Sequence, residues 1–226
     1  MKKTAVILVS GGMDSALTAA IAVKRYEPAF MHFNYGQRTS CGELKAFNDI
    51  ARYFKVKKKL IADIGYLKKI GGSALTDRNI PVEEADLNRK SIPKTYVPFR
   101  NANLLAAAVS WAEVLGAQKI FIGAVEEDSS SYPDTTKKFY KDFNRAVKSG
   151  TKKESRIEIV TPVINMSKKE IVIQSYKYNS PVHLTWSCYK SNDIACGECD
   201  SCALRLRGFR EAGIKDPVKY KKNIKW

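Results

Sequence analysis

The sequence lacks any apolar run that approaches the roughly 20 residues a helix needs to span a membrane. The lysines near the N-terminus precede only a brief apolar stretch, which is too short for the hydrophobic region of a signal peptide. We therefore expect a cytoplasmic protein that does not associate with membranes. Histidine is also scarce, since His32 and His183 are the only two. We expect both to be structural and do not expect histidine to supply the acid–base chemistry.

Acidic residues are few relative to basic ones, with 23 against 39 and a net charge of +16. This surplus suits either a surface for RNA or solvated basic faces around a pocket that attracts ATP. The lysine-rich stretches lack the interleaved aromatic residues of a single-strand binder, which favours the second interpretation. We do not expect direct RNA binding, although the charge alone leaves it open.

Short, β-rich apolar stretches alternate with helical patterns along most of the 226 residues, of which 44% are hydrophobic. The alternation predicts an α/β fold with an open, mostly parallel, doubly wound sheet of about five strands. The strongest helical pattern covers residues 100–115, and Gly116 follows it as a C-cap. Strands are expected at residues 4–9, 29–33, 56–61, 119–123 and 157–160, and helices at 15–25, 41–54, 100–115 and 135–148.

Two segments fall outside this alternation. Residues 71–99 contain three prolines and form a long connection, which we expect to be a lid that closes over ligands and excludes water. Residues 186–226 follow a pattern set by cysteines. We expect residues 1–185 to form the α/β domain and residues 186–226 to form a small metal-binding segment packed on it.

A glycine-containing turn, Ser-Gly-Gly-Met-Asp-Ser, joins the first expected strand to the first helix. Gly11 and Gly12 allow the backbone to approach a ligand closely, and the amides that open the following helix favour an anion. Ser10 and Ser15 offer hydroxyls, while Asp14 can hold the turn or a Mg²⁺ ion. The turn therefore predicts a phosphate site, although an ordinary Gly-Gly turn would carry the same letters.

Four of the five cysteines are clustered, at Cys188, Cys196, Cys199 and Cys202. Paired thiolates at this spacing are typical of a structural, tetrahedral zinc site. An iron–sulfur cluster and a redox-active cysteine pair are the alternatives. Cys41 stands alone in a predicted helix, where we expect it to be a buried small hydrophobe.

Five sequence blocks together resemble one family. SGGMDS resembles the PP-loop of N-type ATP pyrophosphatases. FNYGQR, IPKTYVPFRN, SSSYPDTT and CYKSNDIACGECDSCALR follow in the order and spacing of the 7-cyano-7-deazaguanine synthase (QueC) family. The resemblance implies a homodimeric ligase that uses ATP, Mg²⁺ and structural Zn²⁺. Through an acyl-adenylate and then an amide, it would convert 7-carboxy-7-deazaguanine and ammonia to a nitrile for queuosine or archaeosine in tRNA.

The resemblance also assigns roles to residues. Arg100 would neutralise the substrate carboxylate or the developing phosphate charge, together with Asp14 and Ser15 as catalytic residues. Tyr132 would stack on the deazaguanine ring, and Asp134 would accept from its amino-pyrimidine edge. The expected substrate residues are Tyr35, Gln37, Arg38, Arg100, Tyr132 and Asp134. The expected nucleotide-binding stretch comprises Leu8, Val9, Ser10, Gly11, Gly12, Met13, Asp14, Ser15, Ala16, Leu17 and Thr18.

The chain departs from the family pattern at Thr39, where a histidine is usual, and at Phe99 and Ser131, where glycine is usual. A ring at Phe99 would narrow the substrate mouth, which admits ammonia more readily than a bulky amine, so we favour the nitrile product. The alternatives are a relative that stops at the amide or uses another amine, and a PP-loop enzyme that modifies tRNA directly. A non-enzymatic zinc module would leave the glycine turn unexplained.

Overall fold

The computed structural model describes residues 2–126 and 132–221, and its centre is a five-stranded parallel sheet. The strand order is β3-β2-β1-β4-β5, which confirms the predicted parallel α/β sheet. Every strand bound lies within two residues of the prediction. The strands are β1 (Thr4–Leu8), β2 (Glu27–Asn34), β3 (Lys58–Asp63), β4 (Lys119–Phe121) and β5 (Glu158–Val160).

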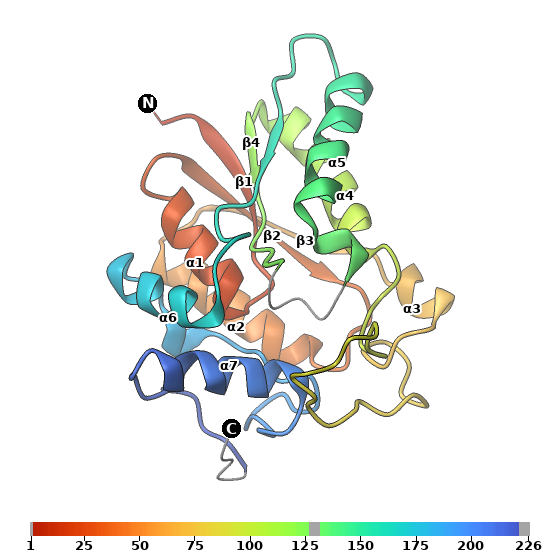
Figure 1. Cartoon of the computed structure of the whole chain (residues 1–226). Coiled ribbons are helices and arrows are strands. Elements are labelled where there is room, and N and C mark those ends of the chain that lie inside the picture. The colour runs from red at the N-terminus through yellow and green to blue at the C-terminus, as the bar shows by residue number, and fades with distance from the viewer. Residues whose placement is uncertain (1, 127–131, 222–226) are drawn as a thin grey trace.

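Helices cover both faces of the sheet (Figure 1). One face is covered by α4 and α5, and the other by α1 and α2 (Figure 1). Gly116 caps α4 in the left-handed conformation, as predicted. The helices are α1 (Met13–Ala22), α2 (Ser40–Tyr53), α3 (Tyr66–Ile70), α4 (Arg100–Leu115), α5 (Lys137–Gly150), α6 (Lys168–Lys177) and α7 (Asp200–Glu211), with short 3₁₀ turns at Pro133–Thr135 and Val182–Leu184.

The two cores follow the alternation of side chains along β1. Val6 packs on the α4 side with Leu105, whereas Ile7 packs on the α1–α2 side with Phe47. All four of these side chains are fully buried. Because successive strand residues point to opposite faces, the continuous apolar run of β1 fills both cores at once.

Helix α6 has no counterpart among the predicted helices. Its start is a capping box, in which Ser167 Oγ accepts from the Glu170 amide while the Glu170 carboxylate accepts from the Ser167 amide. This Ser-x-x-Glu signal, followed by the buried Ile171 and Val172, is visible in the sequence and could have located the helix.

The C-terminal segment is attached to the sheet domain at several points. The Trp186 amide donates to the Gly11 carbonyl at 2.8 Å, and the Gly42 amide donates to Asn192 Oδ1 at 2.9 Å. Helix α7 packs on α6, which in turn packs on α1 (Figure 1). Within residues 2–126 and 132–221, no helix is long and apolar enough to cross a membrane.

The connection at residues 71–99 is anchored rather than free. The Arg38 guanidinium donates to the carbonyls of Ala74, Asp77 and Ile80, each at 2.6 Å. At its far side the Ala85 amide donates to the Glu198 carbonyl at 2.8 Å. The connection is thereby tied both to the loop after β2 and to the cysteine segment, and its movement as a lid stays a prediction.

Candidate active site

A cavity of about 290 Å³ opens at the carboxyl ends of β1, β2 and β4. It lies where the strand order reverses between β1 and β4, the position at which open parallel sheets bind their ligands. The lining residues include Leu8, Val9, Ser10, Gly12, Met13, Asp14, Ser15, His32, Tyr35, Glu43, Thr95, Arg100, Asn101, Leu104, Gly123, Tyr132, Lys168, Trp186, Ser187, Tyr189, Asp200, Ser201 and Leu204.

The glycine turn forms one end of the cavity. Gly11 has a φ of +96°, and a Cβ there would lie 2.8 Å from the Glu43 carbonyl, so only glycine fits this close approach to α2. Ser15 Oγ donates to the Gly12 carbonyl at 2.9 Å and closes the turn. No side chain caps α1, so its first amides have no side-chain partner, and Gly12 and Met13 line the cavity, as an anion site requires.

Lys168, which the sequence reasoning missed, completes this end. It is the first residue of α6, and its ammonium lies 2.8 Å from Asp14 Oδ2. A Cβ on Gly208 of α7 would lie 2.7 Å from Lys168 Cβ, so close packing of α7 fixes the backbone that carries this lysine. A positive charge therefore lies next to the α1 amides, although 154 residues separate the two partners in the chain.

The other end of the cavity carries Arg100 and three tyrosines. Arg100 Nη1 donates to Tyr35 Oη at 3.2 Å, and the guanidinium carbon lies 5.3 Å from the centre of the Tyr35 ring. Tyr132 Oη lies 2.8 Å from Thr95 Oγ1. Burial raises the pKa of Tyr35, Tyr132 and Tyr189, so all three remain neutral phenols near neutral pH. This end can stack planar rings and bind an anion at Arg100.

Three of the predicted substrate residues turn their polar groups away from the cavity. Gln37 Nε2 donates to the Phe33 carbonyl and to Glu43 Oε2, and Arg38 anchors residues 71–99. Asp134 Oδ2 accepts from the Asn101 amide at 2.9 Å and so satisfies the start of α4. None of the three lines the cavity, whereas Tyr35, Arg100 and Tyr132 do.

The predicted nucleotide stretch divides in a similar way. Its cavity-lining members are Leu8, Val9, Ser10, Gly12, Met13, Asp14 and Ser15. Ala16 and Leu17 are fully buried in the helix cores instead. His32 borders the cavity with Nδ1 at 2.9 Å from the Val9 carbonyl, its ring stacks on Phe47, and burial lowers its pKa.

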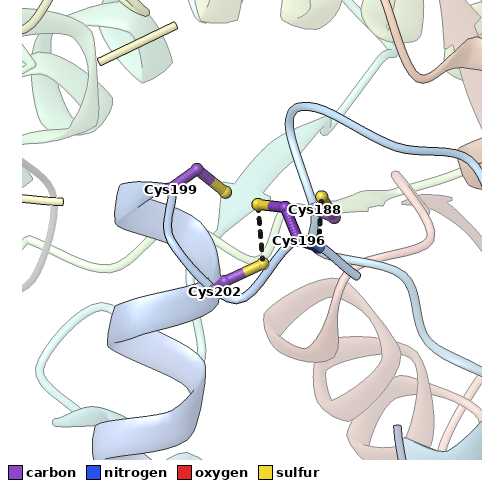
Figure 2. Close-up of side chains that lie close together, drawn as sticks. All are labelled: Cys188, Cys196, Cys199 and Cys202. Atoms are coloured by element: carbon purple, nitrogen blue, oxygen red, sulfur yellow. Dashed lines mark hydrogen bonds between the residues drawn. The ribbon is translucent and has the colours of Figure 1, made fainter. Parts of the chain in front are cut away.

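The four clustered cysteines converge at the start of α7 (Figure 2). Their sulfur atoms all lie within 4.8 Å of one another, and Cys196 Sγ is 3.9 Å from Cys202 Sγ. The backbone amides of Lys190 and Cys196 each approach Cys188 Sγ at 3.3 Å. Hydrogen bonds from the Cys199 and Cys202 thiols, with those two amides, hold the pKa of Cys188 far below its usual value. Four buried sulfurs arranged in this way could hold one metal ion.

The metal-binding segment also supplies part of the cavity wall. Trp186 and Ser187 precede the first cysteine, Tyr189 follows it, and Asp200 and Ser201 follow Cys199 directly. The spacing of the cysteines predicted a metal site but not that their neighbours would line the cavity. The cysteine segment is therefore part of the site and not only an appendage to it.

Two expectations are wrong. Cys41 is exposed on the outer side of α2, because its place in the first helical turn faces solvent while Gly42 and Ala46 face the protein. Phe99 does not narrow the cavity, because it is 60% exposed. Its ring packs edge-on against the ring of Phe139, with 6.2 Å between the two ring centres. Ser131, the other departure of this kind, lies outside the described residues.

Phe99 adopts a backbone conformation that suits glycine, with a φ of +54° and a ψ of +27°. Phe99→Gly and Phe99→Ala both remove the ring, but only glycine relieves this strain. We expect the glycine variant to be more stable than the alanine variant by about 1 kcal/mol in urea unfolding. Both variants should form the same product as the parent protein. Equal stability would show that the left-handed conformation costs nothing here.

The parallel sheet, the glycine turn after β1 and the cavity at the strand ends define the class of protein: a parallel α/β fold with a PP-loop-like glycine turn beside its cavity. Two solved structures share the fold. One is a predicted subunit of a tRNA methyltransferase from Methanocaldococcus jannaschii (TM-score 0.51, 15% identity, 99% of this chain and 94% of that one). The other is the U34-tRNA thiolase NcsA from Methanococcus maripaludis with its [4Fe-4S] cluster (TM-score 0.51, 12% identity, 99% and 76%).

Sequence comparison is more specific. Residues 4–213 match the family described as queuosine biosynthesis protein QueC. The chain is 56% identical over 218 residues to a 7-cyano-7-deazaguanine synthase from Chloroherpeton thalassium, covering 96% of each. It is 54% identical over 220 residues to the synthase of Nautilia profundicola, covering 97% of this chain and 99% of that one. The chain belongs to the QueC family of enzymes.

Proposed function

We propose that this chain is a 7-cyano-7-deazaguanine synthase that activates 7-carboxy-7-deazaguanine with ATP. Ammonia attacks the acyl-adenylate to give an amide, and a second activation dehydrates the amide to the nitrile. Identity above 50% along nearly the whole chain carries the proposal. The nitrile would serve queuosine or archaeosine formation in tRNA. The alternatives that stop at an amide, use another amine or modify tRNA directly are not favoured.

The two ends of the cavity support this chemistry. The open amides of α1 and Lys168 suit the phosphates of ATP, and Ser10 and Ser15 face the same space. Arg100 lies at the other end among aromatic rings, where it can bind the carboxylate of a planar acid. An acid held there has its carboxylate directed toward the nucleotide, as adenylation requires.

Asp14 and the cysteines suit the two expected metals. Asp14 Oδ1 is buried without a partner among the described residues, so it can bind a Mg²⁺ ion that accompanies ATP. A single Zn²⁺ with four thiolates at ~2.3 Å places the sulfurs ~3.8 Å apart, close to the 3.9 Å between Cys196 and Cys202. An iron–sulfur cube spreads its four ligand sulfurs further, because each binds a different iron. We therefore assign zinc, with residues 186–226 as its segment beside an α/β domain of residues 1–185.

Incubation of the purified protein with 7-carboxy-7-deazaguanine, ATP, Mg²⁺ and ammonium should yield the nitrile, with AMP and pyrophosphate formed in both steps. Mass spectrometry of the product tests this, and omission of ammonium is the control. Accumulation of the amide alone, or AMP formation that depends on tRNA, would contradict the proposal. Sedimentation of the same preparation tests the homodimer that we also propose for this cytoplasmic enzyme.

A further inference from the structure

Glu43, in the first turn of α2, is one of the residues that line the cavity. Its Oε1 accepts from Thr39 Oγ1 at 2.9 Å, and its Oε2 accepts from Gln37 Nε2 at 3.0 Å. Both donors are neutral, and each carboxylate oxygen can accept more than one hydrogen bond. The carboxylate is therefore held in a fixed orientation with acceptor capacity left on both oxygens.

The other three carboxylates at or near the cavity are already engaged. Asp14 pairs with Lys168, and Asp134 accepts from the Asn101 amide at the start of α4. Asp200 accepts from the Asp86 amide at 3.0 Å and lies 3.8 Å from Arg89. Among the described residues, only Glu43 combines a place in the cavity wall with side-chain partners that are all neutral.

A carboxylate in this position can accept further hydrogen bonds. Within residues 2–126 and 132–221, no lysine or arginine lies within ion-pair distance of Glu43. Burial raises the pKa of Glu43, while the hydrogen bonds from Thr39 and Gln37 and the charge of Arg100 oppose the rise. A partly desolvated carboxylate without a paired cation is costly, and a ligand with N–H donors offsets that cost.

The neighbours of Glu43 indicate which ligand supplies these donors. Tyr35 and Arg100 interact with it electrostatically, and Tyr132 and Tyr189 line the same cavity. The aminopyrimidinone edge of a guanine-like ring carries two adjacent N–H donors, which match the two oxygens of one carboxylate. The corresponding edge of the adenine in ATP carries one donor and one acceptor, so it cannot satisfy both oxygens.

We propose that Glu43 accepts hydrogen bonds from the N1–H and 2-amino groups of the 7-deazaguanine ring and thereby selects this ring for activation. The assignment rests on the proposed function for the identity of the substrate. The sequence predicted that Asp134 would recognise this edge, but its carboxylate accepts from the backbone amide at the start of α4. We assign the recognition instead to Glu43 in the cavity wall. Thr39, at the position where the family usually has histidine, is a positioning residue that holds Oε1.

Isothermal titration of the full-length, zinc-loaded protein can measure this selection. The probes are 7-carboxy-7-deazaguanine and its analogue without the 2-amino group. The parent protein should prefer the amino compound by about 10- to 100-fold. Glu43→Gln replaces one acceptor by an NH₂ donor and should reduce the preference to less than about 3-fold. Asp49→Asn removes a charge from the same helix outside the cavity and should retain the parent preference.

The outcomes separate this inference from the proposed function. If the parent protein binds neither acid, the proposed function is wrong and the inference falls with it. Glu43→Gln could retain the preference for the 2-amino compound, or bind both acids as the parent does and only slow amide formation. Either result would show that Glu43 does not select the ring, while the synthase assignment would stand. Should Glu43→Gln fail to fold, Thr39→Val decides: it leaves the carboxylate in place, and a preference weakened by about 3-fold or more is expected. An unchanged preference would overturn the inference.

Discussion

Replacing Lys168 with alanine should lower ATP- and acid-dependent pyrophosphate release by about 100- to 1,000-fold. The ammonium group pairs with Asp14 at the uncapped start of α1, which we propose as the site where charge develops when pyrophosphate departs. Without it, the Asp14 carboxylate would face the phosphates uncompensated. The release rate at saturating ATP, measured on protein whose folding has been checked by circular dichroism, gives the result.

Lys169 offers a matched control, because it is the next residue on α6 and is exposed. Lys169→Ala removes the same charge from the same helical turn without reaching the cavity, and we expect its rate to stay within about 2-fold of the parent. Equal rates for Lys168→Ala and Lys169→Ala would remove Lys168 from the phosphate site. A loss of folded Lys168→Ala protein with full activity per folded molecule would assign the lysine a purely structural role.

Loss of a metal ligand should have the largest effect on stability. Cys196→Ser should weaken zinc binding and lower the free energy of unfolding by several kcal/mol, a fall in Tm of about 10 °C for a chain of this size. Cys199 directly precedes α7, and Asp200 and Ser201 of that helix line the cavity. Activity should therefore fall together with stability. Thermal unfolding followed by calorimetry measures the change.

Cys41→Ser is the control for this experiment, because Cys41 is an exposed thiol outside the cluster. Its Tm should stay within about 2 °C of the parent. Elemental analysis of the parent protein should find close to one zinc per chain. Its absorption spectrum should show no band in the visible range. A brown protein with iron and labile sulfide would instead show a cluster like that in the thiolase named above.

Local signals in the sequence were sufficient for the frame of the molecule. The apolar run of β1, the glycines after it and the spacing of the four cysteines each act over a few residues, and each predicts its structure directly. The capping box at Ser167 is of the same kind, and reading it would have revealed α6 as well. The residue patterns therefore determined the parallel sheet, the glycine turn and the clustering of the four cysteines.

Only the tertiary structure decided which polar side chains share the cavity. Lys168 reaches Asp14 because α7 packs closely on α6, and no short-range pattern encodes that contact. Conversely, Arg38 and Phe99 lie within sequence blocks of the site, yet one anchors a loop and the other is largely exposed to solvent. The direction of a side chain depends on packing between distant segments. Motifs could therefore place the site along the chain, while only the folded chain determined which groups face it.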